Sequence, residues 1–477
     1  MAGVAPITAA RRSVALLLVA GALALCGGSA PASGRPLVTG VSGTQNEIEP
    51  LAFERVQHSG AAMVARNLAW SAVAPANEPA DWHPGDPADP NYDWAAVDAW
   101  VSNAVEKGRT PLLTVYGAPR WAQRCHSDEA LVCDPDPAML AAFSKAAATR
   151  YGGHFLGLPR VRFWQALNEP NLKIFWRPQG RGGKTSARLY RALLNRFYET
   201  VKSVHGSNVV LAAGLAPLGT TPPLRFARAL LCMTGRRAPR PTRGNCGGGV
   251  RFDIFDIHPY TSGSPVHKAP LLDQVEMGDL GELQRLLRAA DRAGRISGMY
   301  RRTPLWITEF TYSTKPPDPG GLKMAIAARW TSEALYRAWK AGVSHFFWYL
   351  LRDDPPDGFS QGGLYFRGAS MADDRPKRLL RGFRFPFVAF PRGRGFSLWG
   401  RTPTSQAGSV RVEVRTARGW RAVARATAGA SGVFGGAVGP RPDIGPRTLV
   451  RAVFRGEVSV PFSLKPVADF YQPPFGF

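Results

Sequence analysis

The chain has 477 residues, of which 45% are hydrophobic and 20% are charged, and its formal net charge is +25. This balance is typical of a globular protein with a large core, and it excludes a disordered or fibrous chain. The length allows two or three domains, although an α/β barrel can occupy most of such a chain as one domain.

The positive charge comes from 60 Lys and Arg against 35 Asp and Glu. Three interpretations compete: nucleic-acid binding, affinity for an anionic polysaccharide or cell-wall polymer, and arginine usage without a binding role. The cations are spread over predicted helices and C-terminal strands and form no single basic tract, which argues against a nucleic-acid partner. We expect mainly solvated surface arginine, with contact to an anionic cell-wall polymer as the next hypothesis.

The N-terminus has the pattern of a secretory signal. Two arginines precede an apolar run over 14–26, small residues follow, and Ala-Pro-Ala at 30–32 forms a plausible cleavage site. The run is shorter than the roughly 20 residues that a membrane span needs, so we expect no stable span. A lipoprotein anchor at Cys26 is the alternative, although Leu25 fits poorly just before that cysteine. We therefore predict a signal peptide at 1–32 and a secreted protein.

Four cysteines remain after the signal: Cys125, Cys133, Cys232 and Cys246. An even number of cysteines outside the cytosol favours disulfides over reduced thiols, and three pairings are possible. We expect neighbours in sequence to pair, Cys125 with Cys133 and Cys232 with Cys246, so that each bond closes a loop. No two of them have the spacing of zinc ligands, so we expect no metal site.

From residue 37 onward, strand-like and helix-like stretches alternate regularly. Eight such units favour a closed (β/α)8 TIM barrel over an open doubly wound sheet, and we assign the barrel to 33–390. The expected strands are 37–42, one within 63–73, 110–116, 161–168, 208–215, 252–258, 304–308 and 343–350. The expected helices are 50–59, 93–107, 137–151, 186–205, 223–233, 279–293, 323–340 and 375–382.

Beyond residue 390 the pattern changes. Short stretches with period-two alternation are separated by Gly, Pro and Ser, which predicts a small all-β, sandwich-like domain over 391–477. The domain could serve as a packing or spacer module, or it could bind carbohydrate or a wall polymer. The expected strands are 410–416, 420–426, 448–454 and 457–464.

Two of the barrel strands end on a glutamate. An apolar run from Phe163 stops at Asn168-Glu169-Pro170, and a second from Leu305 ends at Glu309. Proline cannot continue a central strand, so Glu169 is expected at the carboxyl end of its strand. If the barrel closes, both carboxyl groups reach its C-terminal mouth, where barrel active sites lie. Glycoside cleavage with retention needs one carboxylic acid and one carboxylate about 5–5.5 Å apart.

These residues resemble a known family. Asn168-Glu169-Pro170 ends one strand, His258-Pro259-Tyr260 another and Thr308-Glu309 a third, which together resemble the clan A retaining glycoside hydrolases of the cellulase and β-xylosidase type. The resemblance covers roughly 37–390. It implies that Glu169, after strand four, is the acid/base and that Glu309, after strand seven, is the nucleophile. Glu309 lacks the flanking glycine that some members carry.

The resemblance also implies supporting roles. Asn168 would hydrogen-bond the sugar 2-hydroxyl, and Tyr260 would donate to Glu309. His258 lies near the same wall, where it could bind substrate or be structural. Arg66, on strand two, resembles an arginine that helps to position the nucleophile.

Three tryptophans are candidate sugar-binding residues, because the C–H faces of sugars stack on aromatic rings. Trp348 is the expected aromatic floor of the subsite, with core packing as the alternative. Trp121 and Trp176 lie in loops, where they could build further subsites or cover the barrel mouth.

The sequence therefore predicts a secreted retaining glycoside hydrolase that needs no cofactor. It would act on an oligo- or polysaccharide, with no nucleic-acid partner. The competing hypothesis is a carbohydrate- or cell-wall-binding protein that kept the barrel but lost turnover. The sugar, the linkage and the choice between endo and exo action are left open.

Overall fold

The computed structural model describes Met1, Gly3 and residues 34–127, 131–243, 246 and 249–471. The predicted signal peptide, including Cys26, falls outside these residues apart from Met1 and Gly3. No helix within the described residues is long and apolar enough to cross a membrane.

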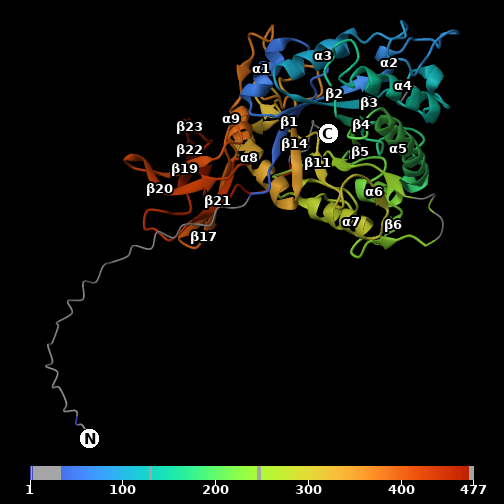
Figure 1. The fold of residues 1–477 in the computed structure, drawn as a ribbon. Coiled ribbons are helices and arrows are strands. Elements are labelled where there is room, and N and C mark those ends of the chain that lie inside the picture. Colours follow the sequence, from blue (N-terminus) through green and yellow to red (C-terminus); the bar gives the residue numbers. More distant parts are fainter. Residues whose placement is uncertain (2, 4–33, 128–130, 244–245, 247–248, 472–477) are drawn as a thin grey trace.

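Eight parallel strands close into a barrel in the order β1-β14-β11-β9-β5-β4-β3-β2, which confirms the predicted fold (Figure 1). Each strand pairs with its predecessor and successor in the chain, as right-handed β-helix-β units require. The barrel strands are β1 (Val38–Ser42), β2 (Met63–Ala69), β3 (Thr110–Tyr116), β4 (Phe163–Ala166), β5 (Val209–Leu215), β9 (Ile254–Ile257), β11 (Leu305–Ile307) and β14 (Val343–Tyr349).

Helices surround the barrel close to where their apolar periodicity predicts them. Local signals set several ends: the Asp136 carboxylate accepts from the backbone N–H groups of Ala138 (2.8 Å) and Met139 (3.2 Å), which caps α4. Gly342, with φ 102°, ends α8. The helices are α1 (Pro50–His58), α2 (Trp70–Val73), α3 (Ala95–Glu106), α4 (Pro137–Arg150), α5 (Lys184–Val204), α6 (Pro223–Leu230), α7 (Leu280–Arg292), α8 (Met324–Ala341) and α9 (Arg378–Arg384).

The barrel interior is layered. At its base lies a small apolar cluster contributed by alternate residues of the strands, separate from the larger core between strands and helices. Above it, Thr114, Gln165, Asp256 and Thr308 form a buried polar layer, and the mouth lies above that layer. Alternation along each strand therefore decides whether a residue faces the site or the helices. The basal cluster consists of Met63, Ala65, Leu112, Val209, Leu211, Ile254, Trp306 and Phe347.

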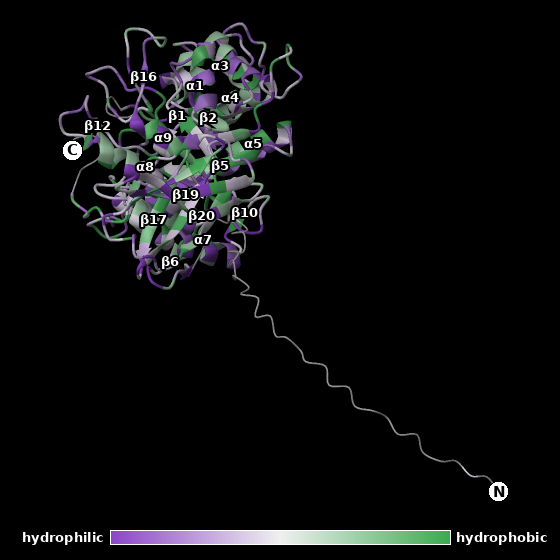
Figure 2. Cartoon of the chain, turned by 90° about the vertical axis from the view of Figure 1, so that its left-hand side faces the viewer, coloured by the Kyte–Doolittle hydropathy of each residue, from purple (hydrophilic) through white to green (hydrophobic). Residues whose placement is uncertain are grey.

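Antiparallel sheets follow the barrel, as predicted. Three of the expected strands match the structure, and the fourth, expected over 457–464, is divided into two short strands. Strands β17, β18 and β21 were missed; β21 contains Gly435-Gly436, and glycine is unusual within a strand. Figure 2 turns these strands toward the viewer and shows hydrophilic and hydrophobic residues mixed along them. One sheet holds β17 (Phe387–Arg392), β18 (Gly395–Arg401) and β21 (Val433–Val438); the other holds β20 (Gly419–Ala428), β19 (Gly408–Thr416), β22 (Leu449–Phe454), β23 (Glu457–Val458) and β24 (Phe462–Ser463).

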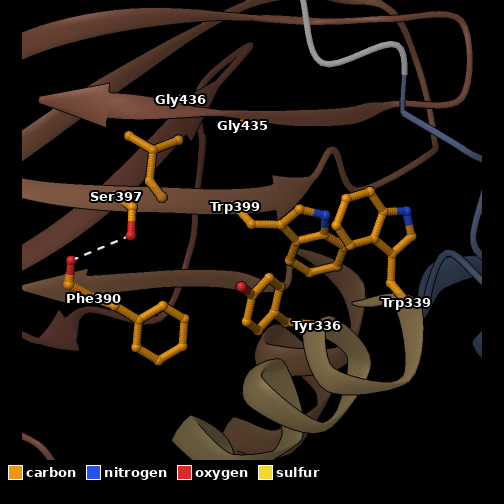
Figure 3. A pocket seen from close by; sticks show the side chains of 8 residues that line it. Tyr336, Trp339, Phe390, Ser397, Trp399, Gly435 and Gly436 are labelled. Atoms are coloured by element: carbon orange, nitrogen blue, oxygen red, sulfur yellow. Dashed lines mark hydrogen bonds between the residues drawn. The ribbon is translucent and has the colours of Figure 1, made fainter. Parts of the chain in front are cut away.

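Aromatic side chains join α8 to the first of these sheets. The Trp399 ring lies 5.5 Å from both Tyr336 and Trp339, measured between centroids, and Phe390 lies 5.3 Å from Tyr336 (Figure 3). These rings line a cavity of about 290 Å³. Its lining has no carboxylate, histidine or cysteine, so it offers no acid–base chemistry.

Candidate active site

The chain turns sharply where β4 reaches the mouth. Leu167 and Glu169 have φ of 62° and 45°, a left-handed conformation that non-glycine residues adopt rarely. The Glu169 N–H donates to the Gly214 carbonyl at 3.2 Å, which fixes the turn against the end of β5. The turn brings the Glu169 side chain into the mouth, where only 8% of the residue stays exposed.

Glu309 follows β11 and comes close to Glu169. One carboxylate oxygen from each glutamate and one His258 ring nitrogen all lie within 4.8 Å of one another. The Tyr260 hydroxyl donates to Glu309 Oε2 at 3.0 Å. Burial, followed by the charge of Glu309, raises the pKa of Tyr260 well above its usual value, so the phenol keeps its proton. The structure thus brings together two carboxyl groups that are 140 residues apart in sequence.

His258 contacts both glutamates and also Thr308 of the buried polar layer beneath the mouth. Its Nδ1 lies 2.9 Å from Glu169 Oε1 and 3.7 Å from Glu309 Oε2, and its Nε2 lies 2.9 Å from Thr308 Oγ1. The Thr308 hydroxyl donates to Asp256, so its oxygen is left to accept from His258 Nε2–H. Burial lowers the pKa of His258, but the negative charges of Glu309, Asp256 and Glu169 outweigh burial and raise it well above 6.5.

The surroundings of Glu309 change how tightly it holds its proton. Burial in the first place, and the nearby charge of Glu169, raise the pKa of Glu309 to about 7, although His258 and Tyr260 oppose this shift. Glu309 therefore keeps its proton to a higher pH than an isolated carboxyl group does.

Asp256 anchors the polar layer beneath the mouth. This fully buried carboxylate accepts from Gln165 Nε2 at 3.0 Å and from the backbone N–H groups of Ile257 (2.9 Å) and Thr308 (3.0 Å). Thr114 in turn donates to Gln165 at 3.2 Å. None of these residues was predicted from the sequence. Their signal was a polar residue within each otherwise apolar strand, which a buried strand tolerates only when the residue has a partner.

Asn168 and Trp121 are two further predicted site residues. Asn168 borders a cavity of about 10 Å³ beside Glu309, with Asn67 and Gln165 on its other sides. That space is about what one water molecule needs. Trp121 is partly exposed, and its indole N–H donates to the Pro75 carbonyl at 2.9 Å.

Arg66 was expected to help position the nucleophile; it lines the same small cavity as Glu309, but its guanidinium hydrogen-bonds elsewhere. Arg66 pairs in register with Leu113, whose side chain packs in the outer core, whereas Asn67 pairs with the interior residue Thr114. The Arg66 guanidinium accordingly points away from the barrel axis, donating to the Ala96 carbonyl at 2.7 Å and lying 6.0 Å from the Trp100 ring. A shift of one residue along a strand exchanges the two faces.

Trp348 was misplaced for the same reason. It is completely buried between β14 and the helices, with its indole N–H donating to the Gly362 carbonyl at 2.8 Å, so core packing was the correct alternative. The neighbouring Tyr349 pairs with Ser42 and faces the mouth. Burial, followed by the charge of Glu309, raises the pKa of Tyr349.

Trp176 is likewise a core residue. It is only 1% exposed and packs edge-on against Tyr190, with ring centroids 6.2 Å apart. Trp176 is therefore removed from the candidate sugar-binding residues.

Both expected disulfides are present. Cys125 bonds to Cys133, and Cys232 bonds to Cys246. Each closes a short loop, with sequence separations of 8 and 14 between the partners. The pairing of neighbours is thus confirmed, and the bonds are those expected of an oxidising compartment.

Glu169, His258 and Glu309 are also the only group of three potential metal ligands found among the described residues. Metal binding would require His258 to lose the proton that its carboxylate neighbours favour. The arrangement of the donors therefore suits proton transfer better than it suits a cation.

Comparison with known proteins bears on the fold. No protein-family model and no curated protein matches the chain. Among solved structures, a family 39 glycoside hydrolase from Bacteroides cellulosilyticus WH2 is 17% identical, with 85% of this chain and 79% of that chain covered and a TM-score of 0.53. The chain therefore has the fold of a family 39 glycoside hydrolase.

Two further solved structures agree. The family 39 enzyme from Xanthomonas axonopodis pv. citri is 16% identical, with 86% of this chain and 93% of that chain covered and a TM-score of 0.50. A monomeric β-xylosidase from Caulobacter crescentus CB15 is 14% identical, with 81% and 84% covered and a TM-score of 0.50. At such identities the likeness is one of fold, and the chemistry must be argued from the site.

Proposed function

We propose that this protein is a secreted retaining glycoside hydrolase that cleaves β-linked O-glycosidic bonds by double displacement. The observation that carries the proposal is the approach of Glu169 and Glu309 oxygens to within 4.8 Å at the barrel mouth. Retention requires carboxyl groups about 5–5.5 Å apart, whereas inversion needs roughly 6.5–9.5 Å to admit a water between carboxylate and sugar. The observed separation favours retention.

In the first step, Glu309 attacks the anomeric carbon while Glu169 donates its proton to the departing glycosidic oxygen. The C–O bond breaks, and a glycosyl ester forms on Glu309. In the second step, Glu169 takes a proton from water, whose oxygen attacks the anomeric carbon and releases Glu309. Each displacement inverts the anomeric centre, so the product retains its configuration.

The neighbouring side chains support these roles. Glu309 must be ionised to attack, and the charge of His258 and the hydrogen bond from Tyr260 favour that form against the burial that raises its pKa to about 7. His258 contacts Glu169 through Nδ1 and helps to hold the acid/base in place. We assign Asn168 to the sugar 2-hydroxyl, and Tyr349 and Trp121 to the walls of the sugar subsites.

The nucleophile assignment is tested by chemical rescue. Glu309→Gly should abolish turnover of natural glycosides, and added azide should restore cleavage of an activated aryl β-glycoside. The product should be the α-glycosyl azide, because a single inversion replaces two. Proton NMR of that product reads its anomeric configuration. A β-azide, or activity retained without Glu309, would contradict the assignment.

Glu169 is tested through the leaving group. Glu169→Ala should lower activity on unactivated glycosides by about 10²–10⁴-fold, while an activated aryl leaving group departs without protonation and suffers less in the first step. Azide should here yield the β-glycosyl azide, because it attacks the glycosyl ester on Glu309. An equal loss on both substrate types would count against the acid role. If the wild type binds oligosaccharides without turning over any of them, the non-catalytic alternative is correct.

Export and domain organisation complete the proposal. The two disulfides suit an extracellular location, in agreement with the predicted signal at 1–32. N-terminal sequencing of the protein recovered from culture medium should begin at residue 33, whereas a lipid-modified Cys26 in the membrane fraction would indicate an anchor instead.

We propose 33–390 as the catalytic barrel and 391–477 as a packing module, because the Trp399 cluster attaches the C-terminal strands to α8.

A further inference from the structure

One stretch of the barrel is strongly basic. Residues 170–252 contain fifteen lysines and arginines but only one acidic residue, Glu199. This excess of basic over acidic residues is not obvious in the sequence, because apolar residues separate the cations in helices and loops. The segment runs from the loop after β4 through α5, β5 and α6 to the hairpin of β6 (Met233–Thr234) and β7 (Arg240–Pro241).

A large groove lies within this segment. Its volume is about 1200 Å³, and it is bounded by α5, α6 and β6, which lie side by side on the outside of the barrel (Figure 1). Along α5, residues at 184, 188, 191 and 195 line it, a spacing that places them on one helix face. At a rise of 1.5 Å per residue, this stripe spans roughly 16 Å. Six cations border the groove: Arg181, Lys184, Arg188, Arg191, Arg225 and Arg228.

Three of these cations are available to a ligand. Arg181, Lys184 and Arg188 are exposed and form no ion pair with any described residue. Glu199, the single acid of the segment, pairs instead with Arg251 at 2.6 Å and does not line the groove.

Two of the other cations build the wall of the groove. Arg191 is buried, and its Nε donates to the Leu230 carbonyl at 2.9 Å, which ties α5 to the end of α6. Arg228 pairs with Asp273 at 2.5 Å. The groove is therefore a shaped, positively charged concavity, and its walls are held by hydrogen bonds.

We propose that this groove binds a chain of an acidic polysaccharide through its carboxylate or sulfate groups. Guanidinium groups pair with such oxyanions in a bidentate geometry, and several cations along one groove suit a linear polyanion. The lining contains no aromatic residue on which nucleic-acid bases could stack, and it is concave, unlike the surface that a membrane requires. The binding does not depend on the catalytic proposal, because the groove lies outside the barrel.

The experiment measures binding of an end-labelled oligogalacturonate to the mature full-length protein by fluorescence anisotropy. The groove variant carries Arg181→Gln, Lys184→Gln and Arg188→Gln, all at exposed positions where substitution should leave the fold intact. The matched control carries Arg392→Gln, Arg418→Gln and Arg425→Gln, three exposed arginines of the C-terminal strands that form no ion pair with described residues. Both variants lose the same charge.

The groove variant should bind more weakly by about fivefold per cation, or roughly a hundredfold for three, while the control changes little. The wild-type affinity should fall steeply with salt, and the groove variant should show a smaller salt dependence. Glu309→Gln should bind as the wild type does, which separates this groove from the mouth. Equal losses in both variants, no binding by the wild type, or tighter binding to a single-stranded oligonucleotide or to phosphatidylglycerol vesicles would overturn the proposal.

Discussion

Asp256 should be the most sensitive residue of the barrel interior. Its carboxylate is completely buried and accepts from four groups: the Gln165 amide, the Thr308 hydroxyl and two backbone N–H groups. Asp256→Ala removes every acceptor at once and leaves four donors without a partner. An unsatisfied buried donor costs about 1–3 kcal/mol, so even the lower limit sums to roughly 4 kcal/mol. That is a large part of the 5–15 kcal/mol by which a typical domain is stable.

The conservative substitution Asp256→Asn should lower the free energy of unfolding much less than Asp256→Ala does. In Asp256→Asn the side-chain oxygen can still accept from the two backbone N–H groups. The new amide can donate to Gln165 if that side chain rotates by half a turn, since the Thr114 hydroxyl can then accept from it. We expect a loss of about 1–2 kcal/mol. The loss of the negative charge should still lower the pKa of His258, because Asp256 is one of the groups that raise it.

Urea denaturation at neutral pH measures both losses, and ¹⁵N chemical shifts of the His258 ring follow its titration. Asp357→Ala, at an exposed site where no hydrogen bond is found, serves as the control for removal of one carboxylate. A loss below about 2 kcal/mol in Asp256→Ala would refute the reasoning. So would equal losses in the Ala and Asn variants, or an unchanged His258 pKa in Asp256→Asn.

Three further predictions follow from the site. Tyr349→Ala should alter KM or kcat for aryl glycosides, whereas Trp348→Ala should cost about 3–5 kcal/mol in unfolding free energy and leave KM nearly unchanged; steady-state kinetics and urea curves distinguish them. Gly214→Ala should destabilise the protein by about 1–3 kcal/mol more than Gly108→Ala. Both glycines have positive φ (53° and 68°), but only at 214 would the added methyl lie 2.4 Å from a buried amide nitrogen. Glu309, with a pKa of about 7 against its ordinary 4.5, binds its proton more tightly when folded, so stability should fall as pH rises through this window. Glu309→Gln should flatten that dependence by up to about 3 kcal/mol between pH 5 and 8 in urea curves, and an unchanged slope would contradict the shift.

Much of this architecture was predictable because local patterns carry it. Apolar runs of strand length alternated with amphipathic helices, and a proline or a polar residue ended each run where the mouth lies. Glu169, His258 and Glu309 could be identified as neighbours because the carboxyl ends of barrel strands converge at one face. The disulfides followed from the same locality, since cysteines a few residues apart in a loop meet easily.

Other features depended on register, which the sequence did not specify. Whether Arg66 or Asn67, and Trp348 or Tyr349, faces the barrel axis depends on a shift of a single residue. Only the closed barrel fixes that choice, because hydrogen bonding to both neighbouring strands leaves each side chain one possible face.

The polar layer and the basic groove also required tertiary structure. The Asp256 network joins four strands, so its members become a unit only when those strands meet. The cations of α5 and α6 are scattered in sequence, and packing of the two helices brings them to one groove. The sequence by itself determined the elements, their order and the chemical groups at their ends. Tertiary structure decided which groups meet, since electrostatic and hydrogen-bonding interactions depend on distance in space and not on separation along the chain.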